Sequence, residues 1–243
     1  MGSILRMRAA RTARRGAALA VAVASLVPLA ACHHSSSSST TTLPSGQALL
    51  RQASQAMAAV TSARFSLQMQ GSLGGLDVRK AEGVLTSEGA GSGTADLEEF
   101  GQLIEFDVVI LKGTVYVKGP TGGFTQLPEV LTGGFYDPTK LLDPTAGLSR
   151  LLATASQART TGTEEVGGTQ TYRVEATLDG SVLSTLVPVP ANKDAPSVLW
   201  ISADSSRLVQ VMATLPAQGS GPPTVVNLEL SEFDVPVTIT PPA

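Results

Sequence analysis

The chain has 243 residues, of which 42% are hydrophobic and 15% charged, with one cysteine and a formal net charge of −3. One cysteine excludes an internal disulfide, and the singly scattered basic residues of the later chain argue against a nucleic-acid surface. Aromatic residues make up only 4%, so the core of a domain of about 200 residues must be aliphatic.

Residues 1–31 have the layout of an export signal. Five arginines precede an apolar run, Ala17 to Ala31, that ends in small residues. A helix of this length rises only about 22 Å, short of the roughly 30 Å hydrocarbon core of a bilayer, and Pro28 further weakens a permanent span. We therefore predict a cleaved signal peptide over residues 1–31.

The segment Leu29-Ala30-Ala31-Cys32 resembles a bacterial lipobox. The resemblance implies diacylglyceryl transfer to the Cys32 sulfur, cleavage before Cys32 and acylation of the new amino terminus. Two or three acyl chains hold a protein firmly on a bilayer, whereas one binds marginally. We expect Cys32 to anchor the chain in the cell envelope, at the outer face of the cytoplasmic membrane. The alternative is an ordinary signal peptide with a chance cysteine.

Loss of the signal would leave 12 basic and 20 acidic side chains and a formal net charge of −8. Residues 32–44 contain His33, His34 and a Ser/Thr run, which is typical of a flexible tether. Both histidines are therefore interpreted as spacer residues and not as metal ligands. We predict that residues 45–243 form a single domain.

That domain opens with a predicted helix near Ser45–Val60, with Ser45 as its N-cap. The period of the hydrophobic pattern then changes to two residues, because Phe65, Leu67 and Met69 alternate with polar residues. This is typical of a strand with one solvent-exposed face. Further strands are predicted near 81–88, 93–99, 102–112, 114–119, 169–177, 197–203, 207–215, 224–232 and 235–240.

Helices are predicted between the two groups of strands, in residues 135–158. Each Asp-Pro pair of this segment suits a helix start, with Asp as cap and Pro at the first position. An apolar stripe follows at helical spacing, formed by Leu148, Leu151, Leu152 and Ala155. A shorter helix over residues 178–188 would end at Pro188. This order predicts an α+β domain, with helices gathered on one side of a large antiparallel sheet.

The expected domain contains no histidine and no cysteine. This removes His-based triads, thiol nucleophiles and the usual zinc sites. The adjacent carboxylates Glu98/Glu99 and Glu164/Glu165 would point to opposite faces of a strand and are interpreted as solvated surface charge. We expect no enzymatic activity, no cofactor and no metal.

Apolar side chains share one face of several predicted strands and helices. Pattern alone does not separate a filled core from a hollow one, and taken by itself it favours a filled core. The candidate residues for an apolar interior are Ala95, Leu97, Ile104, Phe106, Val108, Ile110, Leu148, Leu151, Leu152, Val226, Leu228 and Leu230.

Several segments occur in a characteristic order after the lipobox: "DVVILKGTVYVK", "YDPTKLLDPTAGLSRLL", "GGTQTYRVEATL", "APSVLWIS" and "LSEFDVPVTITPP". Together they resemble a family of actinobacterial envelope lipoproteins, the LppX/LprA/LprF/LprG group. The resemblance implies a curved antiparallel half-barrel, similar to the carriers LolA and LolB, packed against helices around an apolar cavity. Two positions depart from the family pattern. Phe124 stands where relatives tend to have a tryptophan, and Glu98 and Glu99 stand where relatives have a more neutral strand end. These departures concern the identity of the cargo and the shape of the cavity entrance.

The resemblance also implies a function. It predicts a carrier that binds a multiply acylated lipid or glycolipid in the cavity and moves it across the cell envelope, with a membrane lipid exporter as a further partner and no nucleic acid. Alkyl tails need only a dry aliphatic lining, since each buried CH₂ contributes about 0.8 kcal/mol. The alternative is a structural or protein-interaction lipoprotein with a solid core and no lipid cargo.

Overall fold

The computed structural model of the chain describes residues 42–71, 78–99, 101–128, 137–217 and 222–243. Cys32, the expected signal peptide and most of the expected tether lie outside the described residues. The elements are α1 (Gly46–Ala58), β1 (Ser62–Gln70), β2 (Val78–Thr86), β3 (Ala90–Glu99), β4 (Gln102–Leu111), β5 (Thr114–Lys118), β6 (Thr125–Gln126), η1 (Pro138–Leu142), α3 (Leu148–Thr154), β7 (Ser156–Val166), β8 (Thr169–Leu178), α4 (Gly180–Leu186), β9 (Ala195–Ser202), β10 (Leu208–Leu215) and β11 (Thr224–Ser231).

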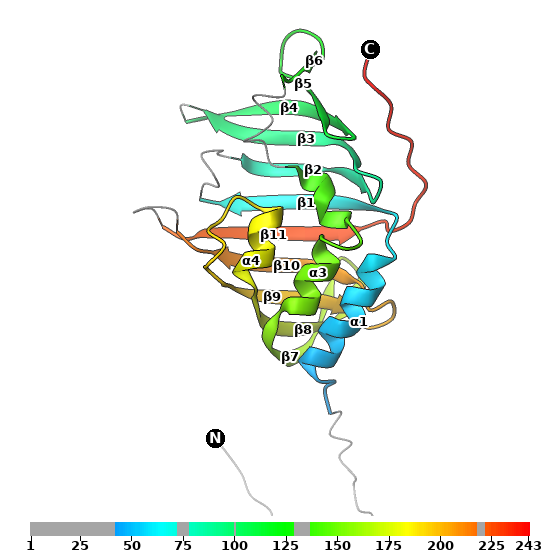
Figure 1. Ribbon diagram of the computed structural model, residues 1–243, viewed down its shortest axis with the longest axis vertical. Coiled ribbons are helices and arrows are strands. Elements are labelled where there is room, and N and C mark those ends of the chain that lie inside the picture. Colours follow the sequence, from blue (N-terminus) through cyan, green and yellow to red (C-terminus); the bar gives the residue numbers. More distant parts are fainter. Residues whose placement is uncertain (1–41, 72–77, 100, 129–136, 218–221) are drawn as a thin grey trace, which may run out of the picture. The chain divides into compact units, whose positions relative to one another are not determined.

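The described strands form one antiparallel sheet in the order β6-β5-β4-β3-β2-β1-β11-β10-β9-β8-β7 (Figure 1). It consists of two meanders, β1–β6 and β7–β11, which join where β1 pairs with β11 and Phe65 lies opposite Leu230. Within each meander, strands that follow one another in the chain thus lie side by side. The connection between β8 and β9 contains α4. The predicted α+β class with one large antiparallel sheet is confirmed.

The helices gather on one face of this sheet, mainly over its carboxyl-terminal half (Figure 1). Helix α1 contacts β7 and β9, α3 contacts β8, and the short 3₁₀-helix η1 contacts β2 and β3. Among the described elements no α-helix covers the same face of β3, β4 and β5. The two halves of the sheet are therefore covered unequally, and this asymmetry positions the site described below.

Helix α1, in the segment predicted to be helical, buries a stripe at helical spacing, formed by Leu49, Leu50, Ala53 and Met57. Ser45 occupies the N-cap position, but its side chain makes no capping hydrogen bond. Its carbonyl instead accepts from the amides of Ala48 and Leu49, each at 3.0 Å. The helix is therefore held by its buried face and not by a side-chain cap.

The two Asp-Pro pairs act differently. Asp137 caps η1, because its side chain accepts from the amide of Thr139 at 3.0 Å. Asp143 caps a turn and accepts from the Thr145 amide at 2.8 Å, so that α3 begins only at Leu148. The predicted leucine stripe of α3 is buried, and the predicted short helix before Pro188 is present as α4.

Two of the predicted secondary-structure assignments are wrong. Residues 156–166, which were not predicted as a strand and whose first residues were assigned to a helix, form β7. This edge strand has mostly exposed positions and hence no apolar alternation. Residues 235–240 were predicted as a strand but pair with no strand among the described residues. Pro236 has no amide hydrogen to donate, and the segment is tied instead by the Ser62 hydroxyl, which donates to the carbonyl of Val235 at 2.7 Å.

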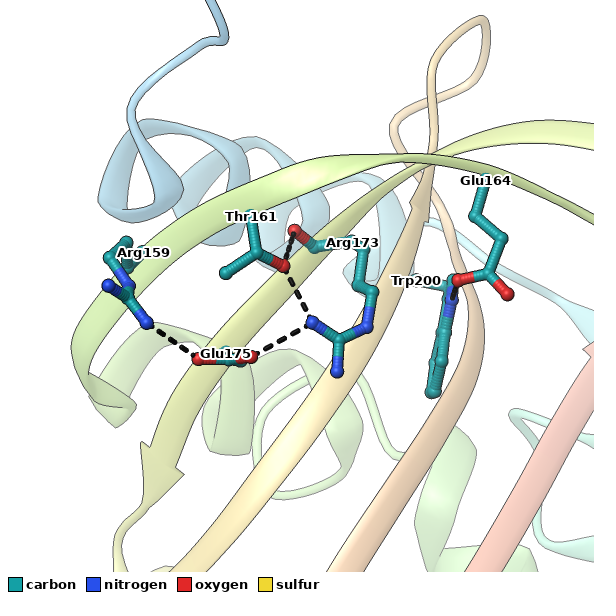
Figure 2. A network of polar contacts seen from close by, with 6 residues as sticks. All are labelled: Arg159, Thr161, Glu164, Arg173, Glu175 and Trp200. Carbon is teal, nitrogen blue, oxygen red and sulfur yellow. Dashed lines mark hydrogen bonds and ion pairs between the residues drawn. The ribbon is translucent and has the colours of Figure 1, made fainter.

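The face of the sheet opposite the helices is polar over β7–β9 (Figure 2). Glu175 accepts from Arg159 at 3.0 Å and from Arg173 at 2.9 Å, and the indole of Trp200 donates to Glu164 at 2.8 Å. Val174, the neighbour of Glu175, is fully buried on the helix side. The described helices include none that is both long and apolar enough to cross a bilayer.

Candidate functional site

A cavity of about 320 Å³ lies on the helix-bearing face of the sheet, over the half that the α-helices leave uncovered. We call it the main cavity because of its apolar lining; a wider groove of about 730 Å³, on the outer face of the sheet, has many polar lining residues. Its floor is formed by strands β1 to β5, and η1 and the segment after α4 each add a proline to its wall. It is lined by Phe65, Leu67, Met69, Val78, Ala81, Glu82, Leu85, Gly91, Ser92, Gly93, Thr94, Ala95, Leu97, Phe106, Val108, Ile110, Val117, Leu127, Pro138 and Pro188.

The strand alternation makes this lining apolar. Successive side chains of a strand point to opposite faces, so the three polar lining residues, Glu82, Ser92 and Thr94, contribute backbone while their side chains face away. Glu82 confirms this geometry, because its carboxylate pairs with Lys80 at 2.6 Å on the outer face. The interior thus offers dispersion contacts and almost no hydrogen-bonding partner.

Small residues keep the floor of the main cavity low. Ala81 and Ala95 lie opposite each other in β2 and β3, and Gly91 and Gly93 continue the same face of β3. A Cβ built on Gly91 would lie 3.0 Å from the Leu85 side chain and 3.1 Å from the Thr139 side chain. Even a methyl group at Gly91 would therefore crowd its neighbours, and larger side chains on this face of β2 and β3 would fill part of the cavity.

The main cavity has a closed and an open end. Leu85 and Ile110 are only 1% and 2% exposed, near η1, whereas Val78 and Leu97 at the other ends of β2 and β3 are half-buried. Val78 lies opposite Leu97 in the sheet. Among the described residues the cavity is therefore closed at its η1 end, and we place its entrance at the end of Val78 and Leu97.

A second hollow, of about 60 Å³, lies beneath α3 and α4. It borders the main cavity, because Leu67 and Met69 of β1 line both. The second hollow is lined only by apolar residues: Leu67, Met69, Leu141, Leu148, Leu151, Leu178, Leu183, Leu186, Val187, Val211, Ala213, Leu215, Val226 and Leu228.

The predicted interior residues are divided between these spaces. Ala95, Leu97, Phe106, Val108 and Ile110 line the main cavity, and Leu148, Leu151, Val226 and Leu228 line the second hollow.

The remaining predicted residues lie elsewhere. Leu152 and Leu230 are buried in the filled core, and Ile104 is half-buried opposite Leu97, outside both linings. Sequence reasoning did not assign the side chains of β1 and β2 to the interior, although the alternation of Phe65, Leu67 and Met69 was the signal that marked them.

Several charged side chains of the domain cap turns or form ion pairs on the outer face of the sheet. The hydroxyl and amide of Ser181 and the amide of Val182 hold the pKa of Asp179 below its usual range at the start of α4. Arg173 and Arg159 do the same for the pKa of Glu175. Glu98 pairs with Arg79 at 2.6 Å, and Lys118 lies 5.8 Å from the Phe124 ring. Within the described residues no group of three or more His, Cys, Asp or Glu is placed to hold a metal ion.

A sequence profile of the LppX_LprAFG lipoproteins matches residues 45–239. The chain belongs to this family. Among the curated members is the lipoarabinomannan carrier protein LprG of Mycolicibacterium smegmatis, which is 33% identical over 93% of this chain and 94% of its own length. LprG of Mycobacterium tuberculosis is 26% identical over 96% and 97% of the two chains.

Two solved structures of the family share the fold. LprF of Mycobacterium bovis superposes with a TM-score of 0.67 over 82% of this chain and 97% of its own, at 22% identity. LppX of Mycobacterium tuberculosis superposes with a TM-score of 0.59 over 80% of this chain and 97% of its own, at 21% identity. This LppX_LprAFG member is thus a lipoprotein-family chain with a large open antiparallel sheet and helices on one face.

Proposed function

We propose that the chain is a membrane-anchored carrier that holds the tails of an acylated lipid or glycolipid in the main cavity and moves them through the cell envelope without a catalytic step. The observation that carries the proposal is the cavity of about 320 Å³ with its apolar lining. Pockets of about 300 to 1,000 Å³ are the usual size for small-molecule sites. The related LprG is named a lipoarabinomannan carrier protein, which supports the same function.

The anchor belongs to the proposal. Acylated Cys32 would confine the domain to the outer face of the cytoplasmic membrane, and residues 33–44 would let the domain move relative to it. The carrier would take its lipid from that membrane or from a membrane exporter and deliver it outward. A solid protein-interaction domain is disfavoured, because such a domain has no use for an empty apolar space beside a filled core.

Mass spectrometry of the chain purified from its native membrane under non-denaturing conditions tests the proposal. We expect a noncovalent adduct that lipid extraction identifies as an acylated lipid. A chain that is repeatedly isolated without lipid, and that takes none from vesicles of its host lipids, would contradict a carrier role.

A further inference from the structure

The groove of about 730 Å³ on the outer face of the sheet lies opposite the helices and is not used by the proposed carrier function. We call it the outer groove. A strongly twisted sheet is saddle-shaped, so each of its faces is hollowed along one diagonal. The lining of the outer groove follows such a diagonal, from Thr94 in β3 across β1 and β11 to Gly167 in the β7–β8 turn.

Two rows of side chains cross four strands on the floor of the outer groove. The members of a row lie directly opposite one another in the sheet: Thr94, Glu82, Ser66 and Glu229 in the first row, and Ser92, Val84, Arg64 and Ser231 in the second. Neighbouring strands lie about 4.8 Å apart, so each row presents a polar group at nearly every step of this length. Such a row suits an extended ligand of repeating polar units that lies across the strands.

Much of the hydrogen-bonding capacity of these rows is unused within the part of the chain that the structure describes. Asn227 and Gln210 donate to the same oxygen of Glu229, at 3.3 and 3.5 Å, so that no described residue donates to its second oxygen. Four hydroxyls of the two rows likewise have no hydrogen-bond partner among the described residues: those of Ser66, Ser92, Thr94 and Ser231.

The charges of the outer groove are largely balanced. Glu232 pairs with Arg64 at 2.9 Å and Glu82 pairs with Lys80 at 2.6 Å, and all four side chains remain about half exposed. Balanced pairs create little field for a cationic peptide or an anion. A protein partner would need a central apolar or aromatic anchor, and Val84 is the one apolar side chain of the two rows. A neutral ligand rich in hydroxyls matches this lining better.

Two further features shape the sides of the outer groove. The indole of Trp200 donates to Glu164 at 2.8 Å and so holds the end of β7 beside the turn whose Gly167 lines the groove (Figure 2). Phe233 adds an aromatic ring to the lining and is itself steadied by Arg207, whose guanidinium lies 5.1 Å from the ring centre. An apolar ring beside polar rows fits a sugar, which has C–H faces and hydroxyl edges.

We propose that the outer groove binds a neutral oligosaccharide whose rings lie across β3, β2, β1 and β11. Each sugar hydroxyl both donates and accepts, so hydroxyls of the bound chain donate to the second oxygen of Glu229 and accept from the guanidinium of Arg64. The C–H faces of the rings pack on Val84 and Phe233. The inference goes beyond the carrier function, because the outer groove lies on the other side of the sheet from the main cavity and needs no acyl chain.

Titration of the full chain with lipid-free sugars tests the proposal. The probes are neutral oligosaccharides of two to five units from dextran, mannan and arabinan, with pentalysine as a cationic peptide of similar length. Saturation-transfer NMR detects binding and calorimetry measures affinity. We expect at least one neutral series to bind with a Kd of about 1 mM or below. Its affinity should rise up to the tetrasaccharide, because the rows cross four strands.

Glu229→Ala should lower the affinity for the bound sugar by about tenfold or more, because hydrogen bonds to a charged group are lost. Arg64→Ala should weaken binding in the same direction, and it provides the answer if circular dichroism melting shows that Glu229→Ala does not fold. Glu105→Ala is the matched control. It removes an exposed carboxylate of β4 that does not line the outer groove, and it should leave the affinity unchanged.

The contrary outcomes are distinct. The proposal is overturned if no neutral series binds at millimolar concentration, or if pentalysine binds in the outer groove in place of the sugars. Sugar binding that neither Glu229→Ala nor Arg64→Ala weakens lies outside the outer groove and overturns it as well. Binding of a fatty acid, measured on the same samples by native mass spectrometry, should be equal in wild type and both variants, so a failure of the sugar site leaves the carrier function standing.

Discussion

Gly83 of β2 lies directly opposite Gly93 of β3, and the two strands approach each other so closely there that neither position has room for a side chain. A Cβ built on Gly83 would lie 2.2 Å from the Ser92 carbonyl oxygen, and one on Gly93 would lie 2.0 Å from that of Glu82. Glycines in strand interiors often mark such close backbone contacts. The pair leaves the floor of the main cavity bare at the centre of β2 and β3.

Gly93→Ala should therefore destabilise the domain. The added methyl group meets backbone atoms, which have no rotamer to escape into, so the two strands must separate and we expect a loss of about 1–3 kcal/mol in the free energy of unfolding. Urea unfolding followed by circular dichroism measures the change. Gly162→Ala in β7 is the control, since nothing lies within 4 Å of its Cβ position, and it should change stability by no more than about 0.5 kcal/mol. Equal effects of the two substitutions would show that the close approach is not a constraint.

Val108→Trp should fill the main cavity and reduce lipid binding. Val108 lines the cavity, whereas its neighbour Val109 lies on the other face of β4 opposite Tyr116. We expect the binding of a fluorescent fatty acid to fall by about tenfold or more in Val108→Trp, because the indole occupies the space of several methylenes, and to stay near the wild-type level in Val109→Trp. A loss of similar size in both variants would point to a general disturbance of β4.

Much of the fold was readable from periodicity. The alternation of Phe65, Leu67 and Met69 and the leucine stripe of α3 were correctly assigned because each has one buried face. Strand β7 was missed because it is an edge strand and has no such face. Its signal was the turn that follows: Gly167 and Gly168 both have positive φ and join β7 to β8 as a two-residue hairpin.

The cavity was less predictable than the sheet. Apolar alternation assigned Ala95 and Val108 to the interior, but the same pattern describes a filled core such as the one that buries Leu152 and Leu230. What decides between a core and a hollow is which elements cover the face, and that depends on long-range packing. Small floor residues at 81, 91, 93 and 95 were a local signal of free space, and its meaning became clear only once β2 and β3 were paired.

Asp234 should make stability depend on pH. Its carboxylate accepts from the amide of Thr61 at 2.8 Å and from the Thr61 hydroxyl at 3.0 Å, and it also pairs with Arg207. The Thr61 amide above all holds the pKa of Asp234 below its ordinary value of 3.8. Because the pKa is lowered in the folded state, the stabilisation is present in full above the ordinary value and is lost as pH falls through the folded-state pKa.

Asp234→Asn should accordingly lower the free energy of unfolding by about 1 kcal/mol at neutral pH, and the difference from wild type should shrink below about pH 4. Thermal melts over a pH series measure both effects. Asp204→Asn, in the exposed turn between β9 and β10, is the matched control and should change the free energy of unfolding by no more than about 0.5 kcal/mol. If the difference in the free energy of unfolding between Asp234→Asn and wild type stays constant down to the lowest pH, the charge of Asp234 does not contribute to stability.

Cys32→Ala should release the protein from the membrane without affecting its fold. In the proposed anchoring, loss of the thiol removes the acceptor of the diacylglyceryl group, and the apolar segment before it is too short to span a bilayer stably. Fractionation of host cells should move the protein from the membrane pellet to the soluble or secreted fraction, and the label from radioactive palmitate should disappear. Retention of the variant in the membrane would rule out Cys32 as the main anchor.

A tryptophan placed in the main cavity offers the most direct measurement of whether acyl chains enter it. The natural Trp200 lies on the outer face of the sheet, where its indole donates a hydrogen bond to Glu164, whereas Phe106 lines the main cavity. Wild type and Phe106→Trp are titrated with a dibrominated stearoyl lysophosphatidylglycerol, whose bromines quench indole emission on contact. We predict that the emission of Phe106→Trp falls as lipid is added while that of wild type stays constant. Emission that stays constant in both proteins, or falls equally in both, would contradict the account.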